Sequence, residues 1–192
     1  FGSENYAKVV SDAAIAAYQN YEGDPAELKF FISETGLANQ KRFESLKYWI
    51  SVWEANGAKI DGINAKLSLS YSEDEAKQAE NKADFDRLLD NLVSAGKLIR
   101  LSNFDITYKD ASGTNVAAKD ITEEQRQRLA DYYAYVIKSY MSKVPSDKQA
   151  GLCKGNMVDT SDPVGLWSID SKSKDWVRTA TYKAFCDALS GK

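Results

Sequence analysis

The sequence predicts an α/β fold in which helices pack over a parallel sheet of four strands. Five segments carry apolar residues at helical spacing, and four short apolar segments between them resemble buried strands. The elements alternate as one helix followed by four strand–helix repeats, which indicates parallel strands joined by right-handed crossovers. The pattern leaves two architectures open, an open four-stranded sheet and part of a (β/α)8 barrel. A complete barrel takes about 250 residues and eight strands, so this chain would supply half of one.

The predicted helices are recognised by apolar residues three or four positions apart, which lie on one helical face. In chain order these faces are Tyr6, Val9, Val10, Ala13 and Ala17; Phe43, Leu46, Ile50 and Trp53; Phe85, Leu88, Leu89 and Leu92; Leu129, Tyr133, Val136, Ile137 and Tyr140; and Tyr182, Phe185 and Leu189. Gly57 and Gly96 are expected to end the second and third helices, because glycine takes the left-handed conformation of a C-terminal cap.

The predicted strands and loops fill the intervals between these helices. The strands are expected at Leu28–Ile32, Ile60–Leu69, Leu98–Tyr108 (with a break near Asn103) and Gly151–Met157. Capping boxes are expected at Ser72 with Glu75 and at Thr122 with Gln125. The longest polar loops are expected at 109–119 and 159–175. No low-complexity linker interrupts this order, so we expect one domain over residues 1–192.

The composition is typical of a globular domain and excludes several classes of partner. The 192 residues are 43% apolar with a net charge of −3, so a nucleic acid is not expected as the main partner. No apolar run approaches the roughly 20 residues that span a bilayer. No signal peptide is visible, and the first residue is Phe1, so we expect a processed or excised chain from which a targeting signal could have been removed.

The absence of histidine restricts the chemistry further. It excludes Ser-His-Asp and Cys-His triads and histidine metal sites, so any catalysis would rest on carboxylates, lysine or tyrosine. We expect no cofactor and no metal site. Cys153 and Cys186 have neither a framework nor a metal-ligand spacing. Two buried thiols are favoured over a single disulfide, which stays possible.

Several short motifs follow one another across nearly the whole chain. They are the opening helix from Tyr6, Asp24–Lys29 (DPAELK), Phe31–Leu37 (FISETGL), Asn56–Ile63 (NGAKIDGI), Ile99–Ile106 (IRLSNFDI), Gly151–Asp159 and Thr181 with Tyr182. In this order they resemble the C-terminal half of glycoside hydrolase family 10, the endo-β-1,4-xylanase family. The strongest match is to the family's Gly-x-x-Ile-Asp-Gly-Ile segment. The resemblance implies a (β/α)8 TIM-barrel-type fold, of which the chain covers about the last four strand–helix units.

The departures from the family concern its catalytic face. The family's nucleophile is the Glu of Ile-Thr-Glu-Leu-Asp-Ile, and Asn103 stands there, although a retaining glycosidase needs a carboxylate at that position. Lys66 and Ser68 replace a Gln and a His, Ser33 replaces an Asn, and Gly155 replaces a Trp. The family's acid/base Glu belongs to the fourth strand, which the resemblance places ahead of this chain. The resemblance therefore implies that both catalytic carboxylates are missing, and we predict no catalytic residue.

The candidate carbohydrate-binding residues lie at strand ends and in the last loop. They are Ser33, Glu34, Lys66, Asn103, Asp105, Asp159, Trp167 and Trp176. Asp105 keeps the family's second acidic position, and a structural hydrogen-bonding role is favoured for it. The tryptophans offer either a stacking face for a sugar ring or a hydrophobic clasp, and the sequence does not separate these.

Three functions remain open on this basis. The first is a catalytically inactive module that binds or presents a xylan-like β-glycan or xylo-oligosaccharide, within a larger protein that resemblance suggests is extracellular. The second is a non-binding assembly scaffold. The third is an active glycosidase that uses Glu34, Asp105 or Asp159. We also expect two unpaired sheet edges and an apolar inner face, which a missing N-terminal half or a second copy of the chain would cover.

Overall fold

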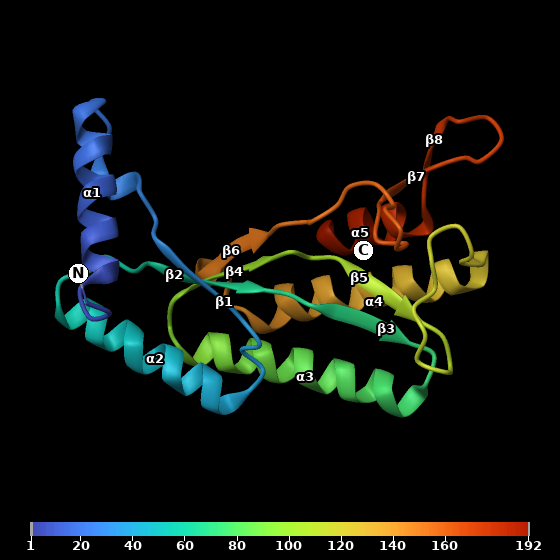
Figure 1. The fold of residues 1–192 in the computed structure, drawn as a ribbon, viewed down its shortest axis with the longest axis horizontal. Helices are drawn as coiled ribbons and strands as arrows, with labels where there is room; N and C mark the ends of the chain where they lie inside the picture. Colours follow the sequence, from blue (N-terminus) through green and yellow to red (C-terminus); the bar gives the residue numbers. More distant parts are fainter. Residues whose placement is uncertain (1, 192) are drawn as a thin grey trace.

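The computed structural model describes residues 2–191 as a parallel sheet with helices packed on it (Figure 1). The main sheet has the order β1-β2-β4-β6, formed by Phe31–Thr35, Gly62–Lys66, Leu98–Ser102 and Gln149–Leu152. All three of its pairings are parallel, as predicted. The helices are α1 (Tyr6–Asn20), α2 (Gln40–Ala55), α3 (Glu75–Ser94), α4 (Glu123–Lys143) and α5 (Ala180–Leu189). Short 3-10 turns lie at η1 (Pro25–Glu27) and η2 (Ser146–Lys148).

Two further parallel strands extend the middle of the sheet. β3 (Leu69–Ser72) continues β2, β5 (Ile106–Lys109) continues β4, and the two pair with each other. The predicted break near Asn103 is therefore confirmed, and the predicted strand Ile60–Leu69 is divided in two. The first and last strands begin three residues later and two residues earlier than predicted, because pairing with β2 and β4 rather than apolar character sets their limits. The loop expected over residues 159–175 contains part of an antiparallel hairpin, β7 (Trp167–Ile169) with β8 (Trp176–Arg178).

The helix ends follow local sequence signals, with one correction. Thr122 and Gln125 form the predicted reciprocal capping box at the start of α4. The box predicted for Ser72 with Glu75 is wrong. Asp74 is the N-cap of α3, because its carboxylate accepts the Lys77 N–H, and Ser72 Oγ instead accepts the Asp74 N–H. The two predicted stop glycines, at positions 57 and 96, have the left-handed φ values of 90° and 65° that such caps require.

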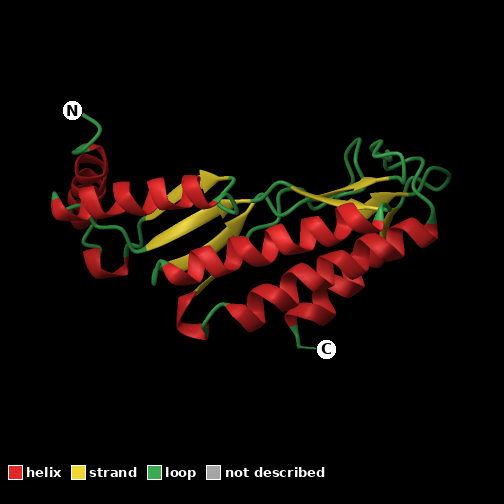
Figure 2. Cartoon of the chain, turned by 90° about the horizontal axis from the view of Figure 1, so that it is seen from below, coloured by secondary structure: helices red, strands yellow, loops and turns green. Residues whose placement is uncertain are grey.

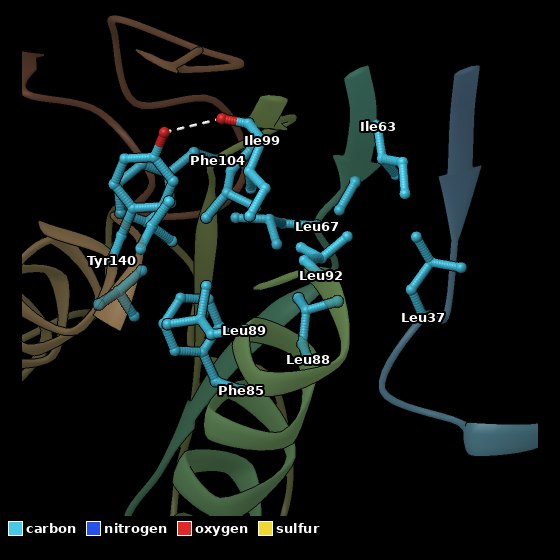
Figure 3. Close-up of a cluster of buried hydrophobic side chains, with 14 of the residues drawn as sticks. Leu37, Ile63, Leu67, Phe85, Leu88, Leu89, Leu92, Ile99, Phe104 and Tyr140 are labelled. Atoms are coloured by element: carbon cyan, nitrogen blue, oxygen red, sulfur yellow. Dashed lines mark hydrogen bonds between the residues drawn. The ribbon is translucent and has the colours of Figure 1, made fainter. Parts of the chain in front are cut away.

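The core lies between the sheet and helices α3 and α4 (Figure 3). The apolar faces predicted for these helices are buried, and they pack against the outward-facing strand residues Ile63, Ile99 and Leu101. Each fully buried side chain of this size stabilises the fold by about 1.5–3 kcal/mol relative to exposure. The hydroxyl of Tyr140 donates to the carbonyl of Ile99 at 2.8 Å, so this core tyrosine also ties α4 to β4.

The other face of the sheet is polar. Figure 2 shows the long helices together on one side of the strands. On the opposite side the register aligns Ser33 with Asn64 and Arg100, where Asn64 donates to Ser33 Oγ at 2.9 Å and Arg100 donates to Asn64 Oδ1 at 3.3 Å. The Arg100 guanidinium lies 4.8 Å from the centre of the Phe31 ring. The expected apolar inner face is therefore wrong, because hydrogen-bonding residues occupy most of it.

The predicted apolar face of α1 is exposed rather than buried. Tyr6 is 62% exposed and Val10 47%, whereas Ala7 and Ser11 form the buried side of this helix. Ser11 turns inward because its hydroxyl accepts the Lys59 N–H at 3.4 Å. The helix, which contacts α2 and η1, thus presents an apolar stripe to solvent at one end of the molecule.

Candidate functional site

The candidate site is the C-terminal end of the parallel strands, where barrel enzymes place their chemistry. A cavity of about 310 Å³ lies there, between the β2–β3 and β4–β5 junctions. Its walls include two of the predicted residues, Asn103 and Asp105, with Ser68, Ser70, Thr107 and Lys109. Thr107 donates to Ser70 Oγ at 3.1 Å across the β3–β5 pair. The structure therefore brings Asn103, Asp105 and Ser68 together at this strand end.

Asn103 stabilises the junction between the β2–β4 pair and the β3–β5 pair. Its φ is +55°, a left-handed conformation that Asn tolerates better than most residues. Its side-chain nitrogen donates to the Leu67 carbonyl at 2.9 Å, and the Leu67 N–H donates to Ser102 O at 2.8 Å. The amide thus links the points at which both strands are interrupted. A carboxylate at this position could not make the donated hydrogen bond, so Asn103 has a structural reason to be an amide.

Asp105 is held by groups from the segment after β6. Its carboxylate forms an ion pair with Lys154 and accepts hydrogen bonds from the Asn156 N–H at 3.1 Å and the Asn156 side-chain amide at 2.6 Å. The side chains of Lys154 and Asp105 are 6% and 14% exposed. Burial lowers the pKa of the Lys154 ammonium, and the Asp105 carboxylate opposes that shift. The acidic group that the family keeps is therefore enclosed by its own partners.

Gly155 permits this enclosure. A Cβ atom built on it would lie 2.4 Å from Asp105 Oδ2, closer than any side chain can approach. The Asp105 carboxylate therefore lies where a side chain at position 155 would begin. The family's tryptophan cannot be accommodated at this position while the Asp105 carboxylate stays in place.

The remaining strand-end candidates lie apart from this cavity. Ser33 shares the open face with Asn64, whereas Glu34 aligns with Ala65 and Leu101 on the helix-packed face. Glu34 accepts the Thr35 N–H at 2.7 Å and an Arg42 hydrogen bond at 2.8 Å, and both bonds hold the pKa of its carboxyl below the usual value.

Lys66 is exposed and lines a second cavity. This cavity has a volume of about 200 Å³ and is also lined by Thr35, Ser68, Asn81 and Phe85. It opens between the loop after β1 and the β2–β3 junction. Since Ser68 lines both cavities, Lys66 lies beside the Asn103 site but does not line it.

Asp159 forms an ion pair with Arg126 inside the protein. Its carboxylate binds Arg126 at 2.7 Å and accepts the Gly165 N–H at 2.8 Å, and both charged side chains are almost fully buried. These contacts fasten the segment after β6 to the first turns of α4. Asp159 is therefore not presented at the strand-end cavity.

The two tryptophans of the last segment differ in exposure. Trp167 packs edge-on against Tyr182, with ring centres 5.4 Å apart, and Arg178 lies 5.3 Å from the Trp167 ring centre. Trp176 is 59% exposed and pairs across the hairpin with Ile169, which is also exposed. Trp167 thus resembles the predicted clasp, and Trp176 offers a free aromatic face on the projecting hairpin.

The sequence reasoning missed Lys154, Asn156 and Arg126. Arg126 contacts the carboxylate of Asp159, and Lys154 and Asn156 contact that of Asp105. The residues of each pair are 33 to 51 positions apart in the sequence. No local motif marks such pairs. The expectation of buried thiols was also wrong, because Cys153 and Cys186 are exposed and form no disulfide. Within residues 2–191, no cluster of three or more potential metal-binding side chains occurs, and no helix is long and apolar enough to span a membrane.

The comparisons with known proteins identify the fold. No protein-family model and no curated protein matches the sequence. Among solved structures, native xylanase10C from Cellvibrio japonicus superposes with a TM-score of 0.66 at 16% identity, covering 93% of this chain and 39% of that chain. A thermostable mutant of the xylanase Xyn10A from the same organism gives 0.67 at 14% identity, covering 91% and 57%.

A fungal enzyme gives a similar result. The endo-1,4-beta-xylanase XylE from Penicillium canescens has a TM-score of 0.62 at 16% identity, covering 93% of this chain and 50% of that chain. The chain therefore spans between about two fifths and three fifths of the xylanases that it matches. Its fold is that of the C-terminal half of a family 10 glycoside hydrolase barrel.

Proposed function

We propose that the chain is a catalytically inactive, xylanase-like module that binds or presents plant-type β-glycans within a larger extracellular protein. The proposal rests on one observation, the contacts that the two polar residues after β4 make within the chain. The resemblance aligns Asn103 with the family's nucleophile position, and this residue donates to the Leu67 carbonyl, while Asp105 is enclosed by Lys154 and Asn156. A retaining glycosidase needs a free carboxylate there, held about 5–5.5 Å from a second one.

Binding without cleavage would use the groups that remain accessible. Lys66 and Asn103 are exposed beside the strand-end cavities, and Trp176 supplies an exposed aromatic face. Aromatic rings provide large apolar contacts of fixed geometry, which suit the faces of a sugar ring. Ser33, Glu34, Asp105, Asp159 and Trp167 remain candidates, but each of them, like Asn103, already has a partner inside the chain.

The test is to incubate the protein with insoluble xylan and xylo-oligosaccharides while following both retention and product release. We expect retention without cleavage, and weaker retention for Trp176→Ala. Tyr21→Ala is the matched control, because Tyr21 is an equally exposed aromatic residue (86%) in the turn after α1. Release of reducing ends would contradict the proposal and favour an active glycosidase.

A second candidate function is assembly, and a specific observation favours it. The exposed apolar stripe of α1 and the unpaired edges of β1 and β6 are surfaces that proteins normally cover. A complementary barrel half or a second copy of the chain would cover them. Light scattering after size-exclusion chromatography tests the second copy. Val10→Asp should then favour the monomer, whereas Asp12→Lys, two residues further along the same helix, should not.

A further inference from the structure

The open face of the main sheet, the side of β1, β2, β4 and β6 turned away from α3 and α4, carries cations without counter-charges. The strand register and the alternation of side chains place Arg100 of β4 on this face, in line with Asn64 and Ser33. Arg100 forms no ion pair within residues 2–191. Lys66, two positions beyond Asn64 on β2, is exposed and forms none there either. The open face is therefore positive, although the chain has a net charge of −3.

The guanidinium of Arg100 is held in one orientation by its neighbours. It lies 4.8 Å from the centre of the Phe31 ring, and its Nε donates to Asn64 Oδ1 at 3.3 Å. Asn64 is itself fixed, because its side-chain nitrogen donates to Ser33 Oγ at 2.9 Å. The Phe31 ring lies over Gly62, where an added Cβ atom would collide with it. Arg100 is thus oriented before any partner binds.

The two terminal nitrogens of Arg100 remain available. They have no hydrogen-bond partner within residues 2–191, and neither of them is fully buried. The residue beside Arg100 on β6 is Gly151, and a Cβ atom built there meets nothing within 4 Å. The space next to the guanidinium is therefore open. A guanidinium with free terminal nitrogens binds a carboxylate through two parallel hydrogen bonds.

The open face lies between the two edges of a half-barrel. β1 and β6 end the main sheet, so each has one side without a neighbouring strand. A second half that pairs with both edges would enclose Arg100 in the barrel interior, which side chains fill in packed layers. A charge removed from water in this way is costly unless an opposite charge pairs with it. The half that closes this barrel must therefore bring a carboxylate.

A second copy of this chain does not meet that requirement. None of the open-face positions of the four strands is acidic. Glu34 of β1 lies on the helix-packed face with Arg42, and Asp105, after β4, is paired with Lys154. A barrel closed by two copies would thus enclose two Arg100 side chains without a counter-charge.

We propose that the open face is closed by a half-barrel of different sequence, which pairs with the edges of β1 and β6 and presents a carboxylate to Arg100. The partner's carboxylate accepts hydrogen bonds from both terminal nitrogens of the guanidinium. The inference rests on the assembly candidate described above, whose partner it specifies, and it does not depend on glycan binding.

The test is titration of the isotope-labelled parent with unlabelled parent, Arg100→Met or Arg100→Glu, followed through backbone amide chemical shifts. Arg100→Glu supplies the missing carboxylate on an otherwise identical half. We expect saturable shifts at Ser33, Asn64 and Gly151. The affinity should be highest for Arg100→Glu and lowest for the parent, because the number of unpaired Arg100 charges rises in that order. Arg100→Glu should bind at least about tenfold more tightly than Arg100→Met, as expected for a close charge pair at an interface.

Arg87→Glu is the matched control, because it makes the same change of charge on α3, where Arg87 is paired with Asp84. It should bind the labelled parent no more tightly than the parent itself does. If Arg100→Glu does not fold, the tighter binding of Arg100→Met relative to the parent tests the same charge effect.

The inference is overturned by the absence of shifts on the open face with every variant, or by equal affinities of the parent, Arg100→Met and Arg100→Glu. Shifts confined to α1 would support assembly through the apolar stripe and overturn the inference about the sheet. Saturable shifts at Asn64 with D-glucuronate, but none with Arg100→Glu, would assign the face to an acidic sugar and also overturn it. Retention on xylan is measured separately, so its failure would refute the glycan-binding module alone.

Discussion

The turn after β4 and the contact region between α3 and α4 differ in whether their polar side chains have hydrogen-bond partners. In the turn, Asn103 and Asp105 each find a partner within the chain, and the Asp105 carboxylate has three donors. Between the two helices, Gln78 Nε2 of α3 and Tyr132 Oη of α4 are buried and have no hydrogen-bond partner among residues 2–191. Polar groups that satisfy each other hold the fold together and are less available to a ligand. The comparison therefore teaches that, within residues 2–191, the strand end after β4 uses its polar groups for internal contacts, whereas two buried donors on α3 and α4 contribute no such contact.

The largest effect is expected from removing the cation that encloses Asp105. Lys154→Ala should destabilise the protein by about 3–5 kcal/mol, because it leaves a buried carboxylate without its counter-charge. Urea unfolding followed by tryptophan fluorescence measures this loss. The double variant Lys154→Met with Asp105→Asn should recover part of it, because no buried charge remains. A loss for Lys154→Ala no larger than for the exposed Lys174→Ala would show that the turn is not held as described.

Gly155→Ala should have the next largest effect. The added methyl group would overlap the Asp105 carboxylate, and overpacking of this kind costs about 1–3 kcal/mol. The same change in an Asp105→Ala background should cost much less, since the obstacle is gone. Equal costs in the two backgrounds, measured by urea unfolding, would refute the explanation given for glycine at this position.

Asn103→Asp should cost about 1 kcal/mol, because the donor to the Leu67 carbonyl is replaced by an acceptor. Asn103→Glu places a carboxylate at the position that the resemblance aligns with the family's nucleophile, and this variant should release no product from xylo-oligosaccharides. A reducing-sugar assay checks the second outcome. Hydrolysis by this variant would mean that the strand end is still a working site that lacks only one group.

Stability should also depend on pH through Glu73. Its carboxylate accepts hydrogen bonds from Gln125 and Tyr108, and these lower its pKa in the folded protein. The stabilisation is therefore present above the usual carboxyl range and is lost as the pH falls through the depressed pKa. The difference in urea midpoint between the parent and Glu73→Gln should shrink as the solution is acidified. A constant difference would contradict the sign of this shift.

The smallest expected effect distinguishes a tyrosine hydroxyl that has a partner, that of Tyr140, from one that has none among residues 2–191, that of Tyr132. Tyr140→Phe should lose about 1 kcal/mol, because it leaves the Ile99 carbonyl without its partner. Tyr132→Phe should lose nothing, since its hydroxyl has no partner among residues 2–191 to give up. Thermal unfolding of the two variants side by side measures the difference. A comparable loss for Tyr132→Phe would place an internal partner on that hydroxyl.

Much of the fold could be predicted from the sequence, because helical periodicity and glycine stops are local signals. The break at Asn103 and the capping box at Thr122 were found in this way. The exposed face of α1 could not be found, since periodicity shows that a helix has an apolar side but not whether another element covers it. Asp105 could be placed at the strand end from the resemblance. Its enclosure by Lys154 depends on a contact across 49 residues that no local pattern records.

The register of the main sheet has a consequence for how this chain folds. Phe31 pairs with Gly62, Gly62 with Leu98, and Ile99 with Gln149, so neighbouring strands are 31, 36 and 50 residues apart in the sequence. No strand pair of the main sheet can form by a short hairpin, and each requires closure of a long loop before its contacts form. β6 requires the longest closure, and the Tyr140 hydroxyl, which donates to the Ile99 carbonyl and accepts the Gly151 N–H, links it to β4 through α4.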